Sequence, residues 1–363
     1  MTFRKISIIG TGLIGGSIAL SLKQSKGYDF IITGFDIDPS SLDIALELGA
    51  INKKANSIEE AVNDADVVFL CTPIKEILQQ IHIVSKHAKS GTIITDVGSV
   101  KKIVLKEAEK IKNDVYFIGG HPMAGSERKG ISSADPFLFE NAVYVLCPNF
   151  NVPIKVVNEF IELIKLTGAN IILLDPEIHD GIAGYISHLP QLIAVLLVNT
   201  VGSMGTDYLS LSGGGFKDLT RIASSQFEIW HDIISFNREK IIEALDNFIN
   251  GLSKYREIIK SNKIGELKPE FDNAFKLRNE IPSSRKGFLN VLHDVFIMVE
   301  DKPGVLSKIS TALYEGGLNI KDIELLRVRE GIGGTFRLSF GSENEAKKAT
   351  EIISKLGYKI FTR

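Results

Sequence analysis

The stretch "KISIIGTGLIGGS", residues 5–17, decides the fold of the first part of the chain. Its apolar run ends at Gly10 and is typical of a buried strand, and a helical pattern follows Gly15. Gly10, Gly12 and Gly15 form the spacing G-x-G-x-x-G, which permits a tight turn and a close approach of the backbone to a phosphate. The helix after the turn points its N-terminus at such an anion. The stretch therefore predicts a strand–turn–helix unit that binds a pyrophosphate.

A carboxylate follows at the spacing that a dinucleotide requires. Asp36 ends the next strand-like run, 21 residues after Gly15, where it can accept hydrogen bonds from a ribose. No Lys or Arg follows it closely, so a 2′-phosphate would meet negative charge. We predict NAD as the cofactor in preference to NADP, with Leu13 and Ile14 among its contacts. The alternative is a structural glycine turn with a helix-capping Asp, but strand, spacing and acid together favour the nucleotide.

Residues 1–174 alternate short apolar runs with helical patterns. Strands separated by helices imply right-handed crossovers and a largely parallel, doubly wound α/β sheet of the Rossmann type. Ligands of such sheets bind at the carboxyl ends of the strands, so Thr72 and Pro73 belong to the predicted cofactor site. Ser99 follows the next run, where it either caps a helix beginning near Val100 or hydrogen-bonds an imidazole or a substrate.

The rest of the chain predicts two further domains. Between 175 and 285 the strand signal disappears, and two stretches, 177–201 and 224–259, predict long helices. Parts of the first are apolar nearly all round, which predicts an all-α domain that packs on a second subunit. A linker with Pro, Ser and Gly covers 280–287. Residues 290–363 then follow the order strand, helix, strand, strand, helix, strand, which is the βαββαβ pattern of a ferredoxin-like fold.

Composition limits the class of protein. The 363 residues carry 42 Lys and Arg against 44 Asp and Glu, a formal net charge of -2, which gives no reason to expect a nucleic acid or an anionic membrane as partner. The longest apolar run, 192–198, is too short to span a bilayer, and the N-terminus lacks a signal-peptide pattern. The two cysteines, Cys71 and Cys147, lack metal-ligand spacing. We predict a cytoplasmic protein with reduced thiols and no metal site.

The stretch "YFIGGHPMAGSE", 116–127, contains a histidine in a position suited to catalysis. Its first three residues suit a strand that Gly119 and Gly120 close, and His121 follows at the predicted ligand edge of the sheet. A neutral imidazole, with an ordinary pKa of about 6.5, can take up the proton of a hydroxyl while a hydride leaves the carbon that bears this hydroxyl. We predict His121 as a general base, and the alternative is a structural histidine.

Two further stretches offer ligands for a substrate. In "SGGGFKDLTRIASS", 212–225, glycines precede a helix that carries Asp218 and Arg221 one turn apart. Arg221 can hold a carboxylate with two hydrogen bonds, and the alternative is a weak surface ion pair with Asp218. In "SHLP", 187–190, His188 lies in an apolar helical stretch, where a core role and a site role are both open.

Six motifs occur in the order in which they stand in the prephenate dehydrogenase family of tyrosine biosynthesis, and residues 1 to about 285 resemble that family: "GTGLIGGSIA", "CTP", "DVGSVK", "GGHPMAGSE", "SHLP" and "GGGFKDLTRIASS". "HPMAG" together with "GFKDLTRIA" is the most specific part of the resemblance. "VEDKPGVLSKIS", 299–310, resembles the first strand, turn and helix of an ACT domain, a fold that binds amino acids as regulators. One departure is Gln191, where relatives often carry a second histidine.

The resemblance implies oxidative decarboxylation of prephenate to 4-hydroxyphenylpyruvate with reduction of NAD. His121 matches the family's catalytic histidine, Ser99 the serine that assists it, and Arg221 the arginine that binds a substrate carboxylate. Other residues match positions that line or gate the pocket: Glu127, Asp218, His188 and Trp230. The ACT resemblance implies an effector site, with tyrosine as the expected effector, at Asp301, Pro303, Gly304, Val305 and Asn319. The family also implies a homodimer.

Three alternatives accompany this interpretation. An arogenate dehydrogenase would act on a substrate with an amino group in place of the side-chain ketone, and nothing in the sequence separates the two substrates decisively. A non-catalytic NAD-dependent amino-acid sensor would not need His121, Ser99 and Arg221 together. A β-hydroxyacid dehydrogenase would use a lysine of the helical domain as its acid–base group, and the sequence offers no lysine in a comparable setting.

Overall fold

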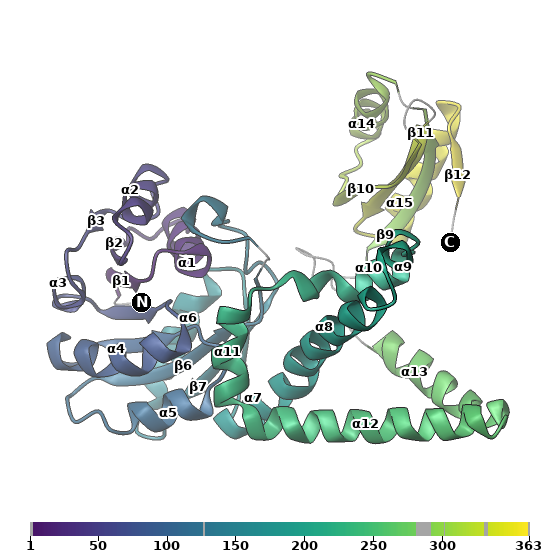
Figure 1. Ribbon diagram of the computed structural model, residues 1–363. Coiled ribbons are helices and arrows are strands. Elements are labelled where there is room, and N and C mark those ends of the chain that lie inside the picture. The colour runs from purple at the N-terminus through teal and green to yellow at the C-terminus, as the bar shows by residue number, and fades with distance from the viewer. Residues whose placement is uncertain (1–2, 126–127, 281–291, 301, 330–332, 362–363) are drawn as a thin grey trace. The chain divides into compact units, whose positions relative to one another are not determined.

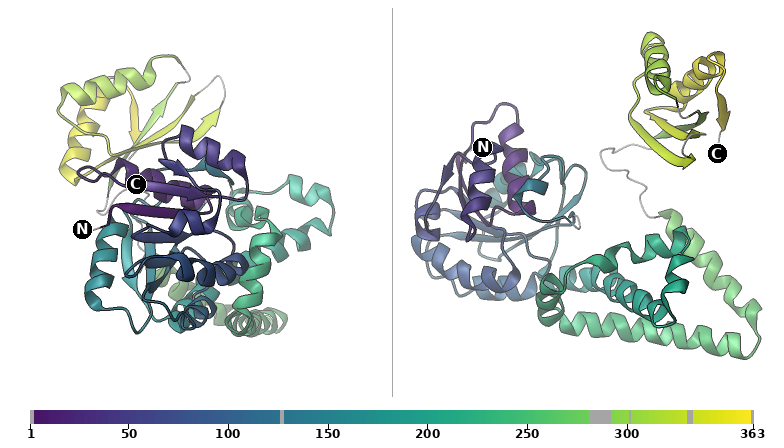
Figure 2. Two further views of the ribbon diagram at one scale, coloured as in Figure 1. Left: turned by 90° about the vertical axis from the view of Figure 1, so that its left-hand side faces the viewer. Right: turned by 45° about the horizontal axis from the view of Figure 1, so that its top comes forward.

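The computed structural model of the chain describes residues 3–125, 128–280, 292–300, 302–329 and 333–361 (Figures 1 and 2). The chain divides into two compact units, Met1–Asn273 and Ala274–Arg363, each with hydrophobic core of its own. The domain boundary predicted near residue 174 lies within the first unit and stays a prediction. The predicted linker at 280–287 lies outside the described residues from position 281 onward.

An eight-stranded sheet forms the centre of the first unit (Figure 1). The strand order is β3-β2-β1-β4-β5-β6-β7-β8, and neighbouring strands are parallel except for the antiparallel pair β6–β7. The strands are β1 Lys5–Ile9, β2 Ile31–Phe35, β3 Lys53–Lys54, β4 Val67–Leu70, β5 Ile93–Asp96, β6 Tyr116–Pro122, β7 Val143–Pro148 and β8 Asn170–Leu173. This arrangement confirms the predicted doubly wound α/β fold.

Helices cover both faces of this sheet because its central strands are apolar on both sides. One hydrophobic cluster joins β1 to α1 (Leu13–Gln24), α2 (Pro39–Glu47) and α6 (Ile154–Lys165). The other cluster joins β4 and β5 to α3 (Ile58–Val62), α4 (Ile74–His87) and α5 (Lys102–Ala108). The turn β1–α1 and the loops β4–α4 and β5–α5 therefore open at the same edge of the sheet, where the predicted cofactor site lies.

Strand β6 extends beyond this edge. Its parallel pairing with β5 ends at Ile118, but antiparallel pairing with β7 continues to Pro122 and includes the pair His121–Val145. The prediction that Gly119 and Gly120 close the strand was wrong. These two glycines lie within the strand, where their surroundings leave no room for a side chain. A Cβ at Gly119 would stand 2.5 Å from a methyl of Leu105, and one at Gly120 would stand 2.5 Å from the Asp96 carbonyl oxygen.

The helical part of the first unit follows β8. Its elements are α7 Pro176–Ala183, a π-helical turn Gly184–His188, α8 Leu189–Gly202, α9 Thr206–Ser210, α10 Gly214–Thr220, the 3-10 turn Arg221–Ser224, α11 Phe227–Phe236, α12 Arg238–Lys260, the 3-10 turn Ile264–Leu267 and α13 Lys268–Glu280, whose last residues belong to the second unit. The π turn was not predicted. It precedes Pro190, which has no N–H to donate to the carbonyl four residues earlier, and the Leu189 N–H bonds Gly184 instead.

The run Pro176–Gly202 is long and apolar enough to cross a membrane by length and composition alone. The expectation that every apolar segment is too short was therefore wrong by this criterion. The run nevertheless carries three buried ionisable side chains, His179, Asp180 and His188, into the interior of the first unit. Buried ionisable groups of this kind belong to the packing of the protein around the helix.

The second unit has the predicted βαββαβ order. Its elements are β9 His293–Val299, α14 Val305–Glu315, β10 Asp322–Arg329, β11 Gly333–Phe340, α15 Glu343–Lys355 and β12 Lys359–Phe361. The sheet order is β10-β11-β9-β12, fully antiparallel, and both helices pack on one face of it through a cluster that includes Ile297, Leu313 and Ile353 (Figure 2). The ferredoxin-like prediction is confirmed.

The glycine turn gives a matched pair of stability tests. A Cβ at Gly15 would stand 2.1 Å from the Gly10 carbonyl oxygen, whereas a Cβ at Gly12 would meet no atom within 4 Å. Gly15→Ala should therefore lower the free energy of unfolding by about 1–3 kcal/mol, the usual cost of overpacking. Gly12→Ala should cost much less. Urea unfolding of both variants checks this, and equal losses would contradict it.

Candidate active site

His121 lies at the centre of a chain of buried side chains. Its ring is 8% exposed, and its Nδ1 lies 2.8 Å from Nε2 of His179 on α7. The two imidazoles meet edge to face, with ring centroids 5.1 Å apart. The next residue of α7, Asp180, places Oδ1 2.8 Å from Nδ1 of His179. The chain therefore runs from the carboxylate of Asp180 through His179 to His121.

Asp180 also caps α5. Its Oδ1 accepts a hydrogen bond from the backbone N–H of Lys101 at 2.7 Å, and its Oδ2 accepts from Lys102 at 2.9 Å. Ser99 therefore does not fill the capping role that the sequence left open for it, and the helix begins at Lys102, two residues later than predicted. A carboxylate suits this position because the first amides of a helix lack partners within the helix.

The hydrogen bonds determine which ring nitrogens carry protons. An ionised carboxylate only accepts, so Nδ1 of His179 must be its donor. When His179 carries only this proton, its Nε2 is bare and accepts the N–H from Nδ1 of His121. The lone pair of His121 is consequently on Nε2, the nitrogen that His179 does not use. This is the tautomer that a general base requires.

A buried ion pair supports His121 from the other side. Nζ of Lys101 pairs with Oδ2 of Asp96 and donates to the carbonyl of Gly120 at 2.7 Å, and both charged side chains are 0% exposed. Asp96 also accepts from the backbone N–H of Gly98 at 2.8 Å and of Gly120 at 3.1 Å. These bonds join the ends of β5 and β6 to the start of α5, and they fix the backbone next to His121.

These surroundings keep His121 neutral. Burial, first of all, and then the neighbouring His179, Lys101 and His188 hold the pKa of His121 well below its ordinary value. The imidazole is therefore in its unprotonated form at neutral pH and can accept a proton.

A cavity of about 460 Å³ lies in front of His121. It is lined by His121, Pro122, Met123, Ala124, Gly125, Ile186, Ser187, Pro190, Gln191, Arg221, Ile222, Ser225 and Trp230. Three of the predicted site residues, His121, Arg221 and Trp230, thus come together from β6, the 3-10 turn and α11. A base and a guanidinium on the wall of one cavity suit an anionic substrate that carries a hydroxyl.

His188 lies behind this cavity. Its Nδ1 accepts from the side-chain amide of Asn237 at 3.1 Å, and the same amide donates to the carbonyl of Asp180 at 2.9 Å. Its ring meets the Trp230 ring edge to face, with centroids 5.9 Å apart. Burial lowers the pKa of His188 to about 4, so this histidine is neutral. Its Nε2 is buried without a hydrogen-bond partner among the described residues.

The remaining predicted site residues do not line the cavity. Asp218 is exposed on α10, and Ser99 is half-buried in the loop between β5 and α5. Glu127 lies outside the described residues. The roles predicted for these three residues stay predictions.

The glycine turn fits a dinucleotide. Gly10 adopts a φ of +94°, and a Cβ there would stand 2.7 Å from the Cys71 carbonyl oxygen, so the turn packs directly on the loop that contains Thr72 and Pro73. Gly12 faces open space, and no side chain of the described residues is recorded as capping the N-terminus of α1, so its first amides can face a phosphate.

Asp36 follows β2 directly and does not cap a helix. Its Oδ2 accepts from the backbone N–H of Thr11 at 2.7 Å, while Asp38 caps α2 by accepting from Ser40 at 3.0 Å. Asp36 therefore does not cap α2, and its predicted contact with a ribose stays a prediction. Across the described residues, no group of three or more His, Cys, Asp and Glu side chains could hold a metal ion.

Sequence reasoning missed four residues of the site: Asp96, Lys101, His179 and Asp180. Lys101 stands inside the motif "DVGSVK" and His179–Asp180 inside the apolar stretch 177–201. A His-Asp pair in an otherwise apolar helix was the available signal, because such polar residues are buried only when they are hydrogen-bonded.

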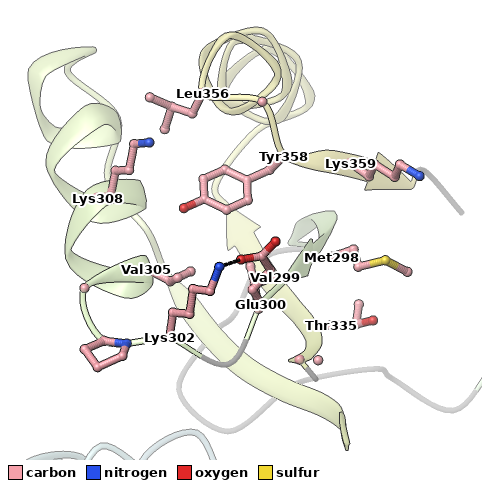
Figure 3. A pocket seen from close by; sticks show the side chains of 15 residues that line it. Met298, Val299, Glu300, Lys302, Val305, Lys308, Thr335, Leu356, Tyr358 and Lys359 are labelled. Carbon is pink, nitrogen blue, oxygen red and sulfur yellow. Dashed lines mark ion pairs between the residues drawn. The ribbon is translucent and has the colours of Figure 1, made fainter. Parts of the chain in front are cut away.

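The second unit contains a separate cavity of about 1140 Å³ at the N-terminus of α14 (Figure 3). Three predicted regulatory residues line it, Pro303, Gly304 and Val305, whereas Asn319 does not, and Asp301 lies outside the described residues. Figure 3 shows Lys308 and the Tyr358 ring facing the hollow, with Glu300 and Lys302 paired at its edge. Nζ of Lys308 lies 6.0 Å from the centroid of the Tyr358 ring.

The sequence matches three family models: the nucleotide-binding domain of prephenate dehydrogenase over residues 18–173, the dimerization domain of prephenate dehydrogenase over 175–273 and the ACT domain over 293–358. Prephenate dehydrogenase of Bacillus subtilis (strain 168) is 36% identical over 362 residues, which cover 98% of this chain and 97% of that protein.

Two solved structures each resemble more than three quarters of the chain. Prephenate dehydrogenase of Aquifex aeolicus, solved in complex with hydroxyphenyl propionate and NAD+, superposes with a TM-score of 0.72 and 33% identity, over 78% of this chain and 99% of that chain. Arogenate dehydrogenase of Synechocystis superposes with a TM-score of 0.67 and 27% identity, over 77% of this chain and 100% of that chain.

Two adjacent lysines test the buried ion pair. Lys101→Met leaves the Asp96 carboxylate buried without its cation, which should lower the free energy of unfolding by about 3–5 kcal/mol. Lys102 is the control, because it pairs with Glu177 at the surface, where both side chains are about half exposed. Lys102→Met should leave stability nearly unchanged. Urea unfolding measures both variants, and a similar effect of the two would contradict the importance of the buried pair.

Proposed function

The chain belongs to the prephenate dehydrogenase family, and we propose that it catalyses the NAD-dependent oxidative decarboxylation of prephenate to 4-hydroxyphenylpyruvate. One observation carries the proposal: the chain Asp180–His179–His121 leaves a bare imidazole nitrogen at a cavity that Arg221 also lines. Prephenate carries the matching groups, a ring hydroxyl and two carboxylates.

The glycine turn and Asp36 would hold NAD. The amides at the start of α1 face the pyrophosphate position beside Gly12, and Asp36 stands at the end of β2, where a ribose hydroxyl can replace the Thr11 contact. Bound NAD would accept the hydride. Ile37 follows Asp36 and is 93% exposed. Its apolar side chain provides no positive charge for a 2′-phosphate.

The cavity residues would bind and orient the substrate. Arg221 pairs with a carboxylate, and Nε2 of His121 accepts the hydrogen bond of the ring hydroxyl. As the hydride leaves the carbon that bears this hydroxyl, His121 takes up the proton. Departure of carbon dioxide then makes the ring aromatic and returns an electron pair toward the oxygen, which recovers the proton from His121. Enzyme and substrate therefore exchange a proton without a net release.

Arogenate is the second candidate substrate, because the Synechocystis relative is an arogenate dehydrogenase. The two substrates differ at the side chain, away from the hydroxyl that His121 serves. Gln191, whose side chain does not ionise, lines the cavity. Paired assays decide between the substrates.

We also infer that an amino acid, expected to be tyrosine, regulates the enzyme through the second unit. The cavity beside α14 offers three lysines and one glutamate, Lys302, Lys308, Lys359 and Glu300. A zwitterion can place its carboxylate near Lys308 and its ammonium near Glu300, with an aromatic ring against Tyr358. The match to an ACT domain supports this role.

The helical part supports a homodimer. Large apolar side chains such as Leu196, Ile249 and Leu252 are more than half exposed there in the single chain, and the match to a dimerization domain covers this segment. A second copy of the chain would cover these side chains, including those of the apolar run Pro176–Gly202. We accordingly propose a dimeric cytoplasmic enzyme.

The proposed reaction predicts NADH formation from prephenate. The absorbance of NADH should rise with prephenate and less, or not at all, with arogenate. His121→Asn should lower kcat by about 10²–10⁴-fold, the usual loss for a general base, while the Kd for NAD stays near normal. Absence of NADH with both substrates, or unchanged turnover of His121→Asn, would contradict the proposal.

Tyrosine should inhibit the full-length enzyme through the cavity beside α14. Lys308→Met should raise the tyrosine concentration that halves activity, because it removes a cation from the cavity. Lys347→Met is the control, since Lys347 lies on α15, is exposed and pairs with Glu343. Tyrosine titrations of NADH formation measure both variants. Full tyrosine sensitivity after deletion of residues 290–363 would overturn the assignment.

A further inference from the structure

We propose that His121 and His179 form one proton relay, in which the proton of the substrate hydroxyl is held as a charge on His179, against Asp180, until carbon dioxide has left. The inference rests on the proposed function and adds to it a second reacting imidazole. It follows from the 2.8 Å contact between the two rings and the 2.8 Å contact between His179 and Asp180.

His121 alone is a poor place for the positive charge. Its ring is buried, and the ammonium of Lys101 is near enough to disfavour a second cation. The base that first accepts the proton is therefore not the group that best retains it. A neighbour that can take the charge over makes the acceptor stronger without exposing it to water.

His179 has the surroundings that His121 lacks. Its Nδ1 faces the carboxylate of Asp180, whose side chain is 3% exposed and is fixed by two backbone amides at the start of α5. A charge on His179 therefore gains a carboxylate partner in a site from which water is excluded. His179 is itself 2% exposed, so the proton cannot be lost directly to solvent.

The charge balance of the buried cluster favours one added proton. The titratable and charged groups around the two rings are Lys101 at the start of α5, Asp96 at the end of β5, His188 in the π turn and Asp180. With neutral imidazoles, one ammonium stands against two carboxylates, a net single negative charge. Uptake of the substrate's proton makes the cluster neutral.

Each transfer is balanced. The substrate O–H bond breaks and its proton binds Nε2 of His121, while the proton on Nδ1 of His121 moves to Nε2 of His179. The O–H electron pair would become the second bond of a carbonyl as the hydride leaves the ring carbon, with bound NAD as the hydride acceptor. When the bond to carbon dioxide breaks, its electron pair flows through the ring to the oxygen, which takes a proton from Nε2 of His121. His121 then recovers its own proton from His179.

His179→Gln tests the relay in the activity assay. The glutamine carbonyl can accept from Nδ1 of His121 and keep its orientation, but it cannot carry the charge. The plateau of kcat should fall about tenfold or more, and the midpoint of its acid limb should move to lower pH, whereas the KM for prephenate should change little. In mixtures of H₂O and D₂O, single-turnover rates should indicate two protons in motion for the native enzyme and one for the variant.

Two further variants separate the relay from a purely structural role. Asp180→Asn removes the charge beside His179 and should also move the acid limb to lower pH. His82→Gln is the control, because His82 is a surface histidine of α4 that pairs with Glu107 of α5. This variant should leave the pH profile of kcat unchanged. A loss of kcat in His179→Gln and Asp180→Asn with unmoved midpoints would overturn the relay.

Nitrogen-15 NMR of the histidines gives a test that needs no turnover. In the native protein at neutral pH, both His121 and His179 should carry their proton on Nδ1. On acidification the added proton should appear on His179 while His121 stays neutral. A proton on Nε2 of neutral His121, or first protonation of His121, would overturn the relay whether or not the enzyme oxidises prephenate. Absence of NADH formation with the expected NMR result would instead overturn the proposed function alone.

Discussion

The carboxylate of Asp180 is the constraint on which the site depends. It accepts three N–H groups, two from the first turn of α5 and one from His179, and so links α7 to the edge of the sheet. The same three bonds fix the position of α5, the orientation of the His179 ring and, through it, the proton on His121. Structure and chemistry cannot be separated here, because one carboxylate acts both as helix cap and as the last member of the histidine chain.

Such an arrangement is expensive in free energy. Two carboxylates and an ammonium are removed from water, and a buried charge is tolerated only when its hydrogen bonds are made. Asp96 satisfies this condition with two backbone amides as well as Lys101. Apolar side chains would have filled the same space with less risk, whereas under the proposed mechanism the charges next to His121 serve the proton chemistry.

The parts of the structure that depend on local patterns could be predicted from the sequence. The glycine spacing, the position of Asp36 and the order of strands and helices each depend on residues close together in the chain. The His-Asp pair in an apolar helix could have indicated buried polar residues, but its partners could not be predicted, because they are 58 residues away at His121 and 79 at Lys101. Within an apolar helix the two residues carry no periodic signal of their own. Serine is a residue type that often caps helices, but the amides at the start of α5 bind the Asp180 carboxylate instead of Ser99. Only the tertiary fold brings this carboxylate near.

The π turn shows how a single proline adjusts the site. In an uninterrupted α-helix, His188 would lie about half a turn around the axis from His179, nine residues earlier, and the two histidines would face opposite sides. The wide turn before Pro190 takes up an extra residue and rotates His188 toward the side of His179, where Asn237 bonds both His188 and the Asp180 carbonyl. Elsewhere on the run, Ile178 and Ile182 stay exposed four residues apart. One helical run thus contributes a polar face to the active site and an apolar face to the surface. The π turn before Pro190 keeps His188 on the polar face.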